Sequence, residues 1–404
     1  MATAQTPSDT AAPPWLDRDR LSAEVDALAA IHRPTASDGE REAAEWVAAR
    51  LDDAGAMARL EREDSNGGYW WPLGLAAAAG AGAGIAALRG RRAIGAAVGA
   101  AATAAAIDDL PPRGRRLRRI LPKRPAWNVV AATGPADAGR TVVVVAHHDT
   151  AHAGLVFHPA LPRIAHRLGL IERNDTSPPL MWPVVAGGGV VAAGALTRSR
   201  WLMRAGAALS AGVAAAMADL GARDAVPGAN DNATGVVAML ALARALAERP
   251  TESVRVMLVS TSEEATCEGM HHFAARHFPS LPRRDTFFLN LDTIGSPHLT
   301  VLRGEGMFGV REYPAHALGL VDRLAEELGI WLFPNLRLRN ATDGVYPLHA
   351  GYPCVSVVSC TELKQPANYH WATDVPRNVD FGTLADAIRL AEATVRRLDE
   401  SWIE

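Results

Sequence analysis

The sequence predicts an α/β fold: a three-layer sandwich with a mostly parallel central sheet, into which two apolar helical hairpins are inserted. Three observations lead to this prediction. Short apolar runs, typical of strands buried on both faces, alternate with helical patterns in the second half of the chain. The 404 residues are 49% hydrophobic and 21% charged, which excludes an intrinsically disordered chain. Two Ala/Gly-rich segments interrupt the alternation and form the inserted hairpins.

The composition also restricts the partners and the compartment of the protein. Lysine and arginine number 41 against 44 acidic residues, and this net charge of −3 gives no electrostatic case for nucleic-acid binding. Three cysteines cannot build a disulfide scaffold, and reduced thiols are expected. The first residues lack the basic and apolar regions of a secretory signal peptide. We therefore expect the chain to begin in the cytosol.

The elements of the α/β core follow from local patterns. Apolar residues recur at helical spacing from Leu21 to Ile31, and Ser37 with Glu40 forms a capping box that begins a second helix. Strand-like runs occupy 127–132, 141–146, 254–260, 286–292 and 353–359. Helical patterns occupy 232–248, 264–277, 314–329 and 380–399. In parallel sheets, functional side chains gather at the carboxyl ends of the strands.

The sharpest motif ends the run 141–146. His147 and Asp149 are two residues apart and therefore lie on one side of the extended chain, whereas His148 points the other way. A carboxylate placed like this can hold the second nitrogen of a metal-binding histidine. A structural histidine near a strand end is an equally simple interpretation of this motif alone.

Four further motifs place polar side chains after strands or in loops. They contribute Asp231, the adjacent Glu263 and Glu264, Asp292 and His370. Single motifs have ordinary structural interpretations, such as an N-cap at 227–235 or acidic residues that complement a helix dipole. Taken together, however, they combine histidines and carboxylates at one end of the sheet. Nitrogen and oxygen ligands without cysteine suit zinc in a water-accessible catalytic site.

The order and the residue patterns of these motifs resemble those of the co-catalytic di-zinc exopeptidases of metallopeptidase family 28. This family includes bacterial leucyl aminopeptidases, aminopeptidase Y and glutamate carboxypeptidase. The matching segments are 146–150, 228–235, 263–264 with Gly269, 290–292, and 369–370 with Asp374. The match lies outside the two apolar hairpins. One departure is Gly344: many members carry a polar residue after Ser-Asp or Thr-Asp in this loop, whereas this chain has Thr342-Asp343-Gly344, which puts substrate contacts there in doubt.

The resemblance implies a zinc exopeptidase-like fold and two zinc ions per chain. Asp231 would bridge the two ions, with His147 and Asp292 completing one site and Glu264 and His370 completing the other. The resemblance further implies a strained, cis peptide bond after Asp231.

The implied catalytic residues are Glu263 and Asp149. A water held between the metals would attack the peptide carbonyl, while Glu263 takes its proton and returns it to the leaving amine. We therefore expect a zinc-dependent aminopeptidase that removes N-terminal residues from peptides. A carboxypeptidase, a glutaminyl-cyclase-like enzyme that works with one zinc, and a catalytically silent receptor-like or scaffold membrane protein remain as alternatives.

The apolar hairpins cover 69–110 and 178–220, each with a short basic tip. Residues 70–88 and 180–197 contain no charged side chain over nineteen and eighteen positions, close to the roughly 20 needed to span a bilayer. Tryptophans lie near the ends of these stretches, as in an aromatic belt. We therefore expect the hairpins to lie in a lipid bilayer. A soluble helical cap, packed on itself or on a second subunit of a homo-oligomer, is the alternative.

The distribution of basic residues gives the orientation. Residues 113–124 hold seven lysines or arginines, against three at 89–92 and three at 198–204 around the tips. By the positive-inside rule, the catalytic domain, expected over 16–66, 126–150 and 224–404, lies on the cytoplasmic side. A soluble cytoplasmic protein is the alternative.

Overall fold

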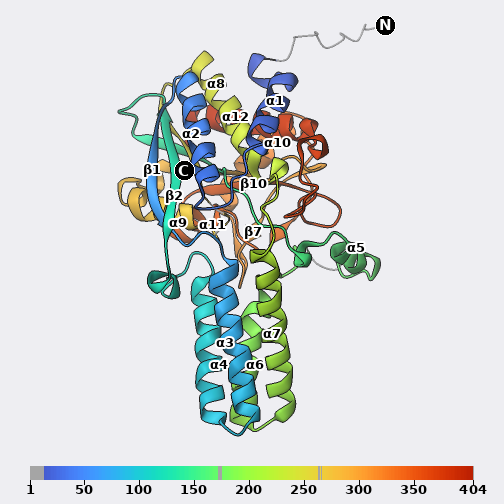
Figure 1. The fold of residues 1–404 in the computed structure, drawn as a ribbon. Coiled ribbons are helices and arrows are strands. Elements are labelled where there is room, and N and C mark those ends of the chain that lie inside the picture. Colours follow the sequence, from blue (N-terminus) through green and yellow to red (C-terminus); the bar gives the residue numbers. More distant parts are fainter. Residues whose placement is uncertain (1–12, 172–174, 263, 265, 404) are drawn as a thin grey trace.

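The computed structural model describes residues 13–171, 175–262, 264 and 266–403 (Figure 1). Within these residues, the core is a seven-stranded sheet in the order β1-β2-β4-β3-β5-β10-β6. Its strands are β1 (Met57–Ser65), β2 (Arg124–Thr133), β3 (Arg140–His147), β4 (Val254–Thr261), β5 (Thr286–Asp292), β6 (His298–Val301) and β10 (Cys354–Cys360). The central strands β4, β3, β5 and β10 are parallel, and the outer strands pair antiparallel. The predicted α/β sheet is therefore confirmed.

The alternation of side chains in β3 shows why the sheet is covered on both faces. Val142 and Val144 belong to one hydrophobic core, whereas Val143 and Val145 belong to the other, and all four are buried. A strand that is apolar on both sides is stable only inside a sheet with two covered faces. Each of the five strand-like runs corresponds to an observed strand, and the edge strands β1 and β6 are additional.

Helices cover the two faces of the sheet. One core is formed with α1 (Arg18–Ala29), α2 (Asp38–Asp53), α8 (Thr234–Glu248), α10 (Ala315–Glu327) and α12 (Phe381–Glu400). The other core is formed with α9 (Glu268–His277), α11 (Val345–Ala350) and the near ends of the helices of the bundle described below. A small separate sheet consists of β7 (Gly304–Glu305), β8 (Arg311–Glu312) and β9 (Arg337–Leu338).

Two helix starts differ in detail from the prediction. The Ser37 side chain accepts the Glu40 N–H, as expected, but Glu40 Oε1 accepts the Trp127 N–H (2.8 Å), so the carboxylate joins α2 to β2 instead of completing a capping box. Helix α9 begins at Glu268 rather than at 264. The reason is that Thr266 and Cys267 have positive φ values (68° and 58°), which an α-helix does not permit.

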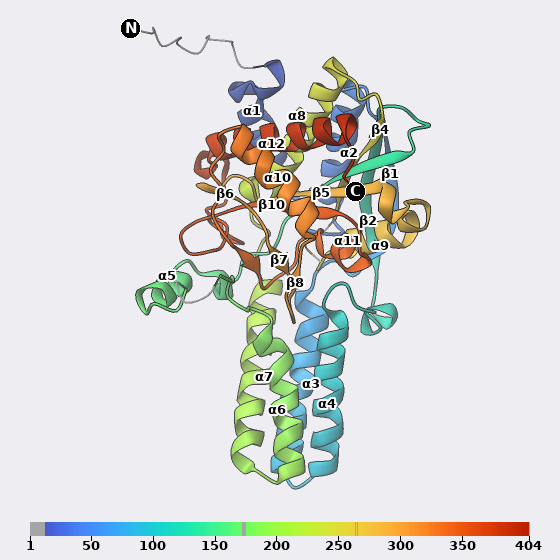
Figure 2. The same ribbon diagram turned by 180° about the vertical axis from the view of Figure 1, so that it is seen from behind.

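The two apolar hairpins pack together as one antiparallel bundle that projects from the α/β part of the molecule (Figures 1 and 2). Its helices are α3 (Trp70–Leu88), α4 (Arg92–Asp109), α6 (Trp182–Thr197) and α7 (Arg200–Gly221). Among the helices in the described ranges, α3 and α7 are long and apolar enough to cross a membrane, and α6 is apolar but shorter. Side chains exposed on the bundle surface include Leu75, Ile85, Ile94 and Leu196.

Small residues bring the bundle helices close together. A Cβ atom at Gly206 would lie 2.6 Å from the Val191 backbone nitrogen, and one at Gly99 would lie 2.7 Å from the carbonyl oxygen of Gly188. Neither approach leaves room for a side chain. The helices of the bundle therefore contact one another through backbone surfaces, as small residues allow in helix pairs.

This packing predicts opposite effects for two glycine substitutions in α7. Gly206→Ala should lower the free energy of unfolding by about 1–3 kcal/mol, because the added methyl group meets the α6 backbone. Gly212→Ala is the matched control: a Cβ there has nothing within 4 Å, so the helix should gain up to about 1 kcal/mol from better propensity. Thermal unfolding of the two variants compares them, and equal effects would contradict the close packing.

Candidate active site

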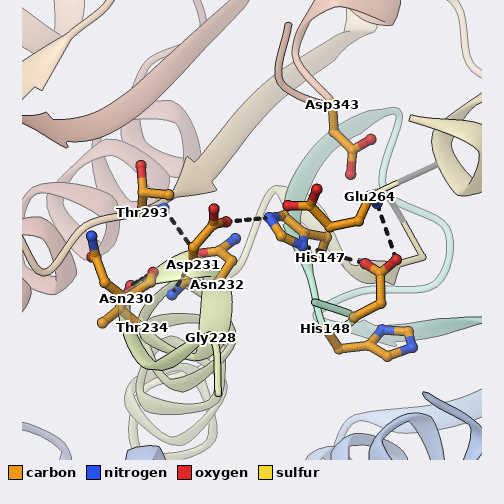
Figure 3. A network of polar contacts seen from close by, with 12 residues as sticks. His147, His148, Gly228, Asn230, Asp231, Asn232, Thr234, Glu264, Thr293 and Asp343 are labelled. Carbon is orange, nitrogen blue, oxygen red and sulfur yellow. Dashed lines mark hydrogen bonds and ion pairs between the residues drawn. The ribbon is translucent and has the colours of Figure 1, made fainter. Parts of the chain in front are cut away.

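The residues singled out in the sequence converge at the carboxyl ends of the parallel strands. His147 is the last residue of β3, Asp292 is the last residue of β5, and Glu264 follows β4. Asp231 lies in the distorted turn η4 (Ala229–Ala233) that leads into α8, and His370 lies in the loop after β10. Figure 3 shows His147, Asp231 and Glu264 facing one another. Glu263, the expected general base, lies outside the described residues.

Asp231 occupies the centre of the cluster. Its Oδ1 lies 3.2 Å from His147 Nε2, and its Oδ2 lies 3.3 Å from His370 Nε2. His370 Nε2 is also 3.4 Å from Glu264 Oε1. Two groups of potential ligands result, His147–Asp231–Asp292 and Asp231–Glu264–His370, and within each group the ligand atoms lie within 4.8 Å of one another. Asp231 belongs to both groups.

Asp149 holds two members of this cluster, His147 and Glu264, in place. Its Oδ1 lies 3.4 Å from His147 Nδ1, while its Oδ2 accepts the backbone N–H of Glu264 (3.0 Å) and the Thr35 hydroxyl. The predicted geometry, with His147 and Asp149 on one side of the chain, is confirmed. His148 points the other way, where its ring contacts Ser260 Oγ (2.9 Å).

The loop that carries Asp231 is held by its neighbours. Asp374 accepts the backbone N–H groups of Asn230 (2.8 Å) and Asp231 (3.1 Å). Asn232 Oδ1 accepts the N–H of Gly235 at the start of α8 (3.0 Å). The helix-cap interpretation of this motif therefore applies to Asn232, whereas Asp231 faces the cluster. The Asp231–Asn232 peptide bond is cis, as expected.

Arg33 contributes to the site, although no motif in the sequence singles it out. This fully buried guanidinium donates to the carbonyl oxygens of His148 (2.6 Å), Leu28 (2.9 Å), Pro227 (2.7 Å) and Gly228 (2.7 Å). It therefore ties the end of β3 to the loop that precedes Asp231. Burial lowers the pKa of Arg33 to about 10, so the side chain remains charged at neutral pH.

The cluster carries more negative charge than its basic groups balance. Asp343, directly before the position where the sequence departs from the resembled pattern, is buried beside it and accepts a hydrogen bond from the Thr261 hydroxyl. Burial, followed by repulsion from Asp231 and Glu264, raises the pKa of Asp292 to about 8. The nearby imidazole of His147 opposes this shift. Imidazole nitrogens and carboxylate oxygens in such an arrangement fit divalent metal ions well.

A comparison with protein families finds a match for the part of the chain that holds most of this cluster. The model of peptidase family M28 matches residues 212–395. Residues 212–395 are therefore similar to peptidase family M28. Asp231, Glu264, Asp292 and His370 lie within the matched range, and His147 precedes it. None of the curated protein sequences compared with this chain matches it.

Solved structures with a similar fold span nearly the whole chain. A Zn-dependent exopeptidase from Parabacteroides distasonis is 14% identical, with a TM-score of 0.54, 96% of this chain covered and 99% of the other. Tannerella forsythia glutaminyl cyclase is 16% identical, with a TM-score of 0.54 and coverages of 95% and 98%. A zinc aminopeptidase from Bacillus subtilis is 14% identical, with a TM-score of 0.54 and 94% of both chains covered. The predicted zinc exopeptidase-like fold is therefore confirmed.

The cluster opens into a pocket whose remaining wall is largely apolar. Tyr69, directly before α3, and Met181, directly before α6, line it together with Leu180 and Phe157. The Phe157 ring packs edge-on against His370, with ring centroids 4.5 Å apart. The pocket therefore lies where the bundle joins the α/β fold.

The role of Arg33 predicts a large effect of its removal. Arg33→Met should lower the free energy of unfolding by about 3 kcal/mol or more, because buried carbonyl oxygens lose their charged donor. Arg20→Met in α1 is the control, since Arg20 is half exposed and makes an i,i+4 ion pair with Glu24, so its loss should cost less than about 1 kcal/mol. Urea unfolding measures both, and similar losses would contradict the proposed anchoring.

Proposed function

We propose that the protein is a zinc-dependent exopeptidase, and more specifically an aminopeptidase with two zinc ions per chain. The observation that carries this proposal is the pair of ligand groups that share Asp231. Two zinc ions bound there would polarise the scissile carbonyl and provide an activated water. The family match of residues 212–395 and the fold similarity to zinc exopeptidases support the same assignment.

The residues of the chain have distinct tasks in this proposal. Asp149 fixes the His147 ring through Nδ1, which leaves Nε2 directed towards Asp231. The same Asp149 carboxylate holds the backbone of Glu264. Glu263, the residue directly before Glu264, is the proposed general base that takes a proton from the attacking water and transfers it to the leaving amine.

The charges around the pocket favour an amino terminus over a carboxyl terminus as the recognised end. Among the pocket-lining residues that the structure describes, Lys364 is the one lysine or arginine, and its ammonium donates to the Ile171 carbonyl oxygen (3.1 Å). A carboxypeptidase needs a basic group for the terminal carboxylate. The acidic side chains that line the pocket, Asp231, Glu264 and Asp292, instead suit a free ammonium group. The zinc aminopeptidase from Bacillus subtilis, similar in fold, agrees with this choice.

A glutaminyl cyclase is the second candidate, because Tannerella forsythia glutaminyl cyclase is equally similar in fold. The two candidates differ in the reaction and in the metal count expected for each. An aminopeptidase releases the first residue of a peptide, whereas a cyclase releases ammonia from an N-terminal glutamine. Measuring both products from a glutamine-initiated peptide separates the two candidates.

The aminopeptidase proposal predicts hydrolysis of peptides with a free amino terminus. Activity should disappear when the metal is chelated and return on addition of zinc, because the ligand cluster alone supplies no electrophile. Release of the N-terminal amino acid, followed by chromatography, measures the reaction. Comparable cleavage of N-acetylated peptides would refute the aminopeptidase assignment but leave the metallopeptidase assignment intact.

The shared position of Asp231 predicts how metal content responds to substitution. Asp231→Ala should lower the occupancy of both zinc sites. Asp292→Ala and His370→Ala should each lower the occupancy of mainly one site, because the two residues belong to different ligand groups. Glu263→Gln is the control: it should keep both ions and lose kcat by about 10²-fold or more. Elemental analysis combined with turnover measures these effects. Loss of metal in the Glu263 variant would show that the roles of the two glutamates are reversed.

We also propose that the bundle is embedded in a lipid bilayer, with the catalytic domain on the cytoplasmic side. Helix α3 has no charged side chain along its 19 residues, which extend about 28 Å, close to the ~30 Å of the hydrocarbon core. A soluble bundle would place polar residues on its outer face, but Leu75 (52% exposed) and Leu196 (75% exposed) lie there. Trp201 at the tip and Trp182 at the base fit the aromatic belts of a membrane protein.

The membrane proposal predicts that the full-length protein stays in the membrane fraction after washing with alkaline carbonate. Only detergent should extract it, because the apolar outer face of the bundle would otherwise contact water. Immunoblotting of the fractions provides the measurement. Recovery in the soluble fraction without detergent would refute the proposal.

A further inference from the structure

Helix α5 (Ala160–Arg167) has an unusual position in the fold. In both views it stands out from the side of the molecule, next to α7, at the level where the bundle begins (Figures 1 and 2). None of its eight residues, all of which the structure describes, is buried. A helix this short gains little stability from its own hydrogen bonds in water. Its sequence therefore needs another explanation than packing on the core.

The side chains of α5 divide into an apolar face and a basic face. Leu161, Ile164 and the following Leu168 fall within about 60° of one another at 100° per residue, and they are 51%, 51% and 62% exposed. Arg163 and His166 project from the opposite side of the helix. An apolar face combined with basic residues is the pattern of helices that lie in the plane of a membrane surface.

Charge around the bundle base indicates which surface would cover this face. The segment 113–124 leaves the bundle at the same end, after α4, and five of its seven lysines and arginines are exposed, whereas Arg115 and Arg118 are buried. Ile120 in this segment is 82% exposed, so an apolar side chain again accompanies the basic ones. Anionic phospholipid headgroups complement such a basic zone, and acyl chains complement the apolar side chains.

We propose that α5 is a membrane-surface helix whose apolar face enters the interfacial region of an anionic bilayer beside the bundle, with Arg167, at the border of that face, directed towards lipid phosphates. This proposal rests on the proposed placement of the bundle in a bilayer. It adds a second contact with lipid, parallel to the membrane surface, to the contact made by the bundle.

The chain that leads into α5 connects this contact to the catalytic pocket. The Leu155 N–H donates to Asp219 near the end of α7 (2.7 Å), and two residues later Phe157 packs on His370 and on Tyr369. Phe157 also lines the pocket. A bilayer that holds α5 therefore fixes the segment that forms one wall of the pocket.

Site-specific labelling tests the position of α5 in the full-length protein. The three native cysteines are buried, so a cysteine introduced at the surface can be labelled selectively with an environment-sensitive fluorophore. Ile164→Cys places the label on the apolar face, and His166→Cys on the opposite face is the matched control. Val98→Cys places a label on the outside of the bundle, where the side chain is exposed. Vesicles of phosphatidylcholine and phosphatidylglycerol with brominated acyl chains provide the quencher.

We expect the lipid to quench labels at 164 and 98 several-fold more than the label at 166, and quenching at 164 to weaken without phosphatidylglycerol. Quenching at 98 but not at 164 would overturn the proposal for α5 and leave the bundle in the bilayer. Absence of quenching at both positions would overturn the membrane placement itself. Equal quenching at 164 in the two lipid compositions would overturn the recognition of anionic headgroups. None of these readouts depends on catalysis.

The link to the pocket has its own test in the same vesicles. Ile164→Gln should lower kcat/KM several-fold, whereas His166→Gln, which keeps the apolar face, should leave it unchanged. Unchanged activity in Ile164→Gln, despite lipid contact at 164, would overturn the influence of α5 on the pocket wall.

Discussion

The buried carboxylate of Asp231 is the constraint on which the rest of the site depends. It is itself only 3% exposed and lies between two imidazoles, 3.2 Å from His147 and 3.3 Å from His370. Removing several ionisable groups from water costs several kcal/mol per ion unless partners offset it. Much of the local structure supplies such partners: Asp374 binds the backbone of Asp231, and Arg33 binds the loop that precedes it. A metal ion in each ligand group would balance the remaining negative charge.

The sequence could predict the members of this cluster because strand geometry is regular. A strand buried on both faces is recognisable from its run of valines, and the first polar residues after it must lie at the edge of the sheet. The spacing of two between His147 and Asp149 then fixes their common side. His370 follows no such rule, since it lies in a loop, and only the resemblance to a family connected it with Asp231.

Other parts of the fold were not predictable for equally physical reasons. Arg33 acts through backbone carbonyl oxygens, which any sequence provides, so no second motif identifies its partners. Strand β1 is rich in charged residues and resembles a loop. Its buried Glu61 is nevertheless satisfied by Arg276 and His277 of α9. The packing of the two hairpins against each other depends on contacts between segments far apart in the chain, which periodicity within one segment does not reveal.

The bundle is connected to the catalytic cluster at both of its insertion points. The first hairpin lies between β1 and β2, the second between β3 and α8, and the near ends of both pack in the same core beneath the sheet. Tyr69 and Met181, which precede α3 and α6, also form part of the pocket wall. The orientation of the bundle therefore sets the orientation of the pocket. If a bilayer surrounds the bundle, its surface lies at the level of this wall.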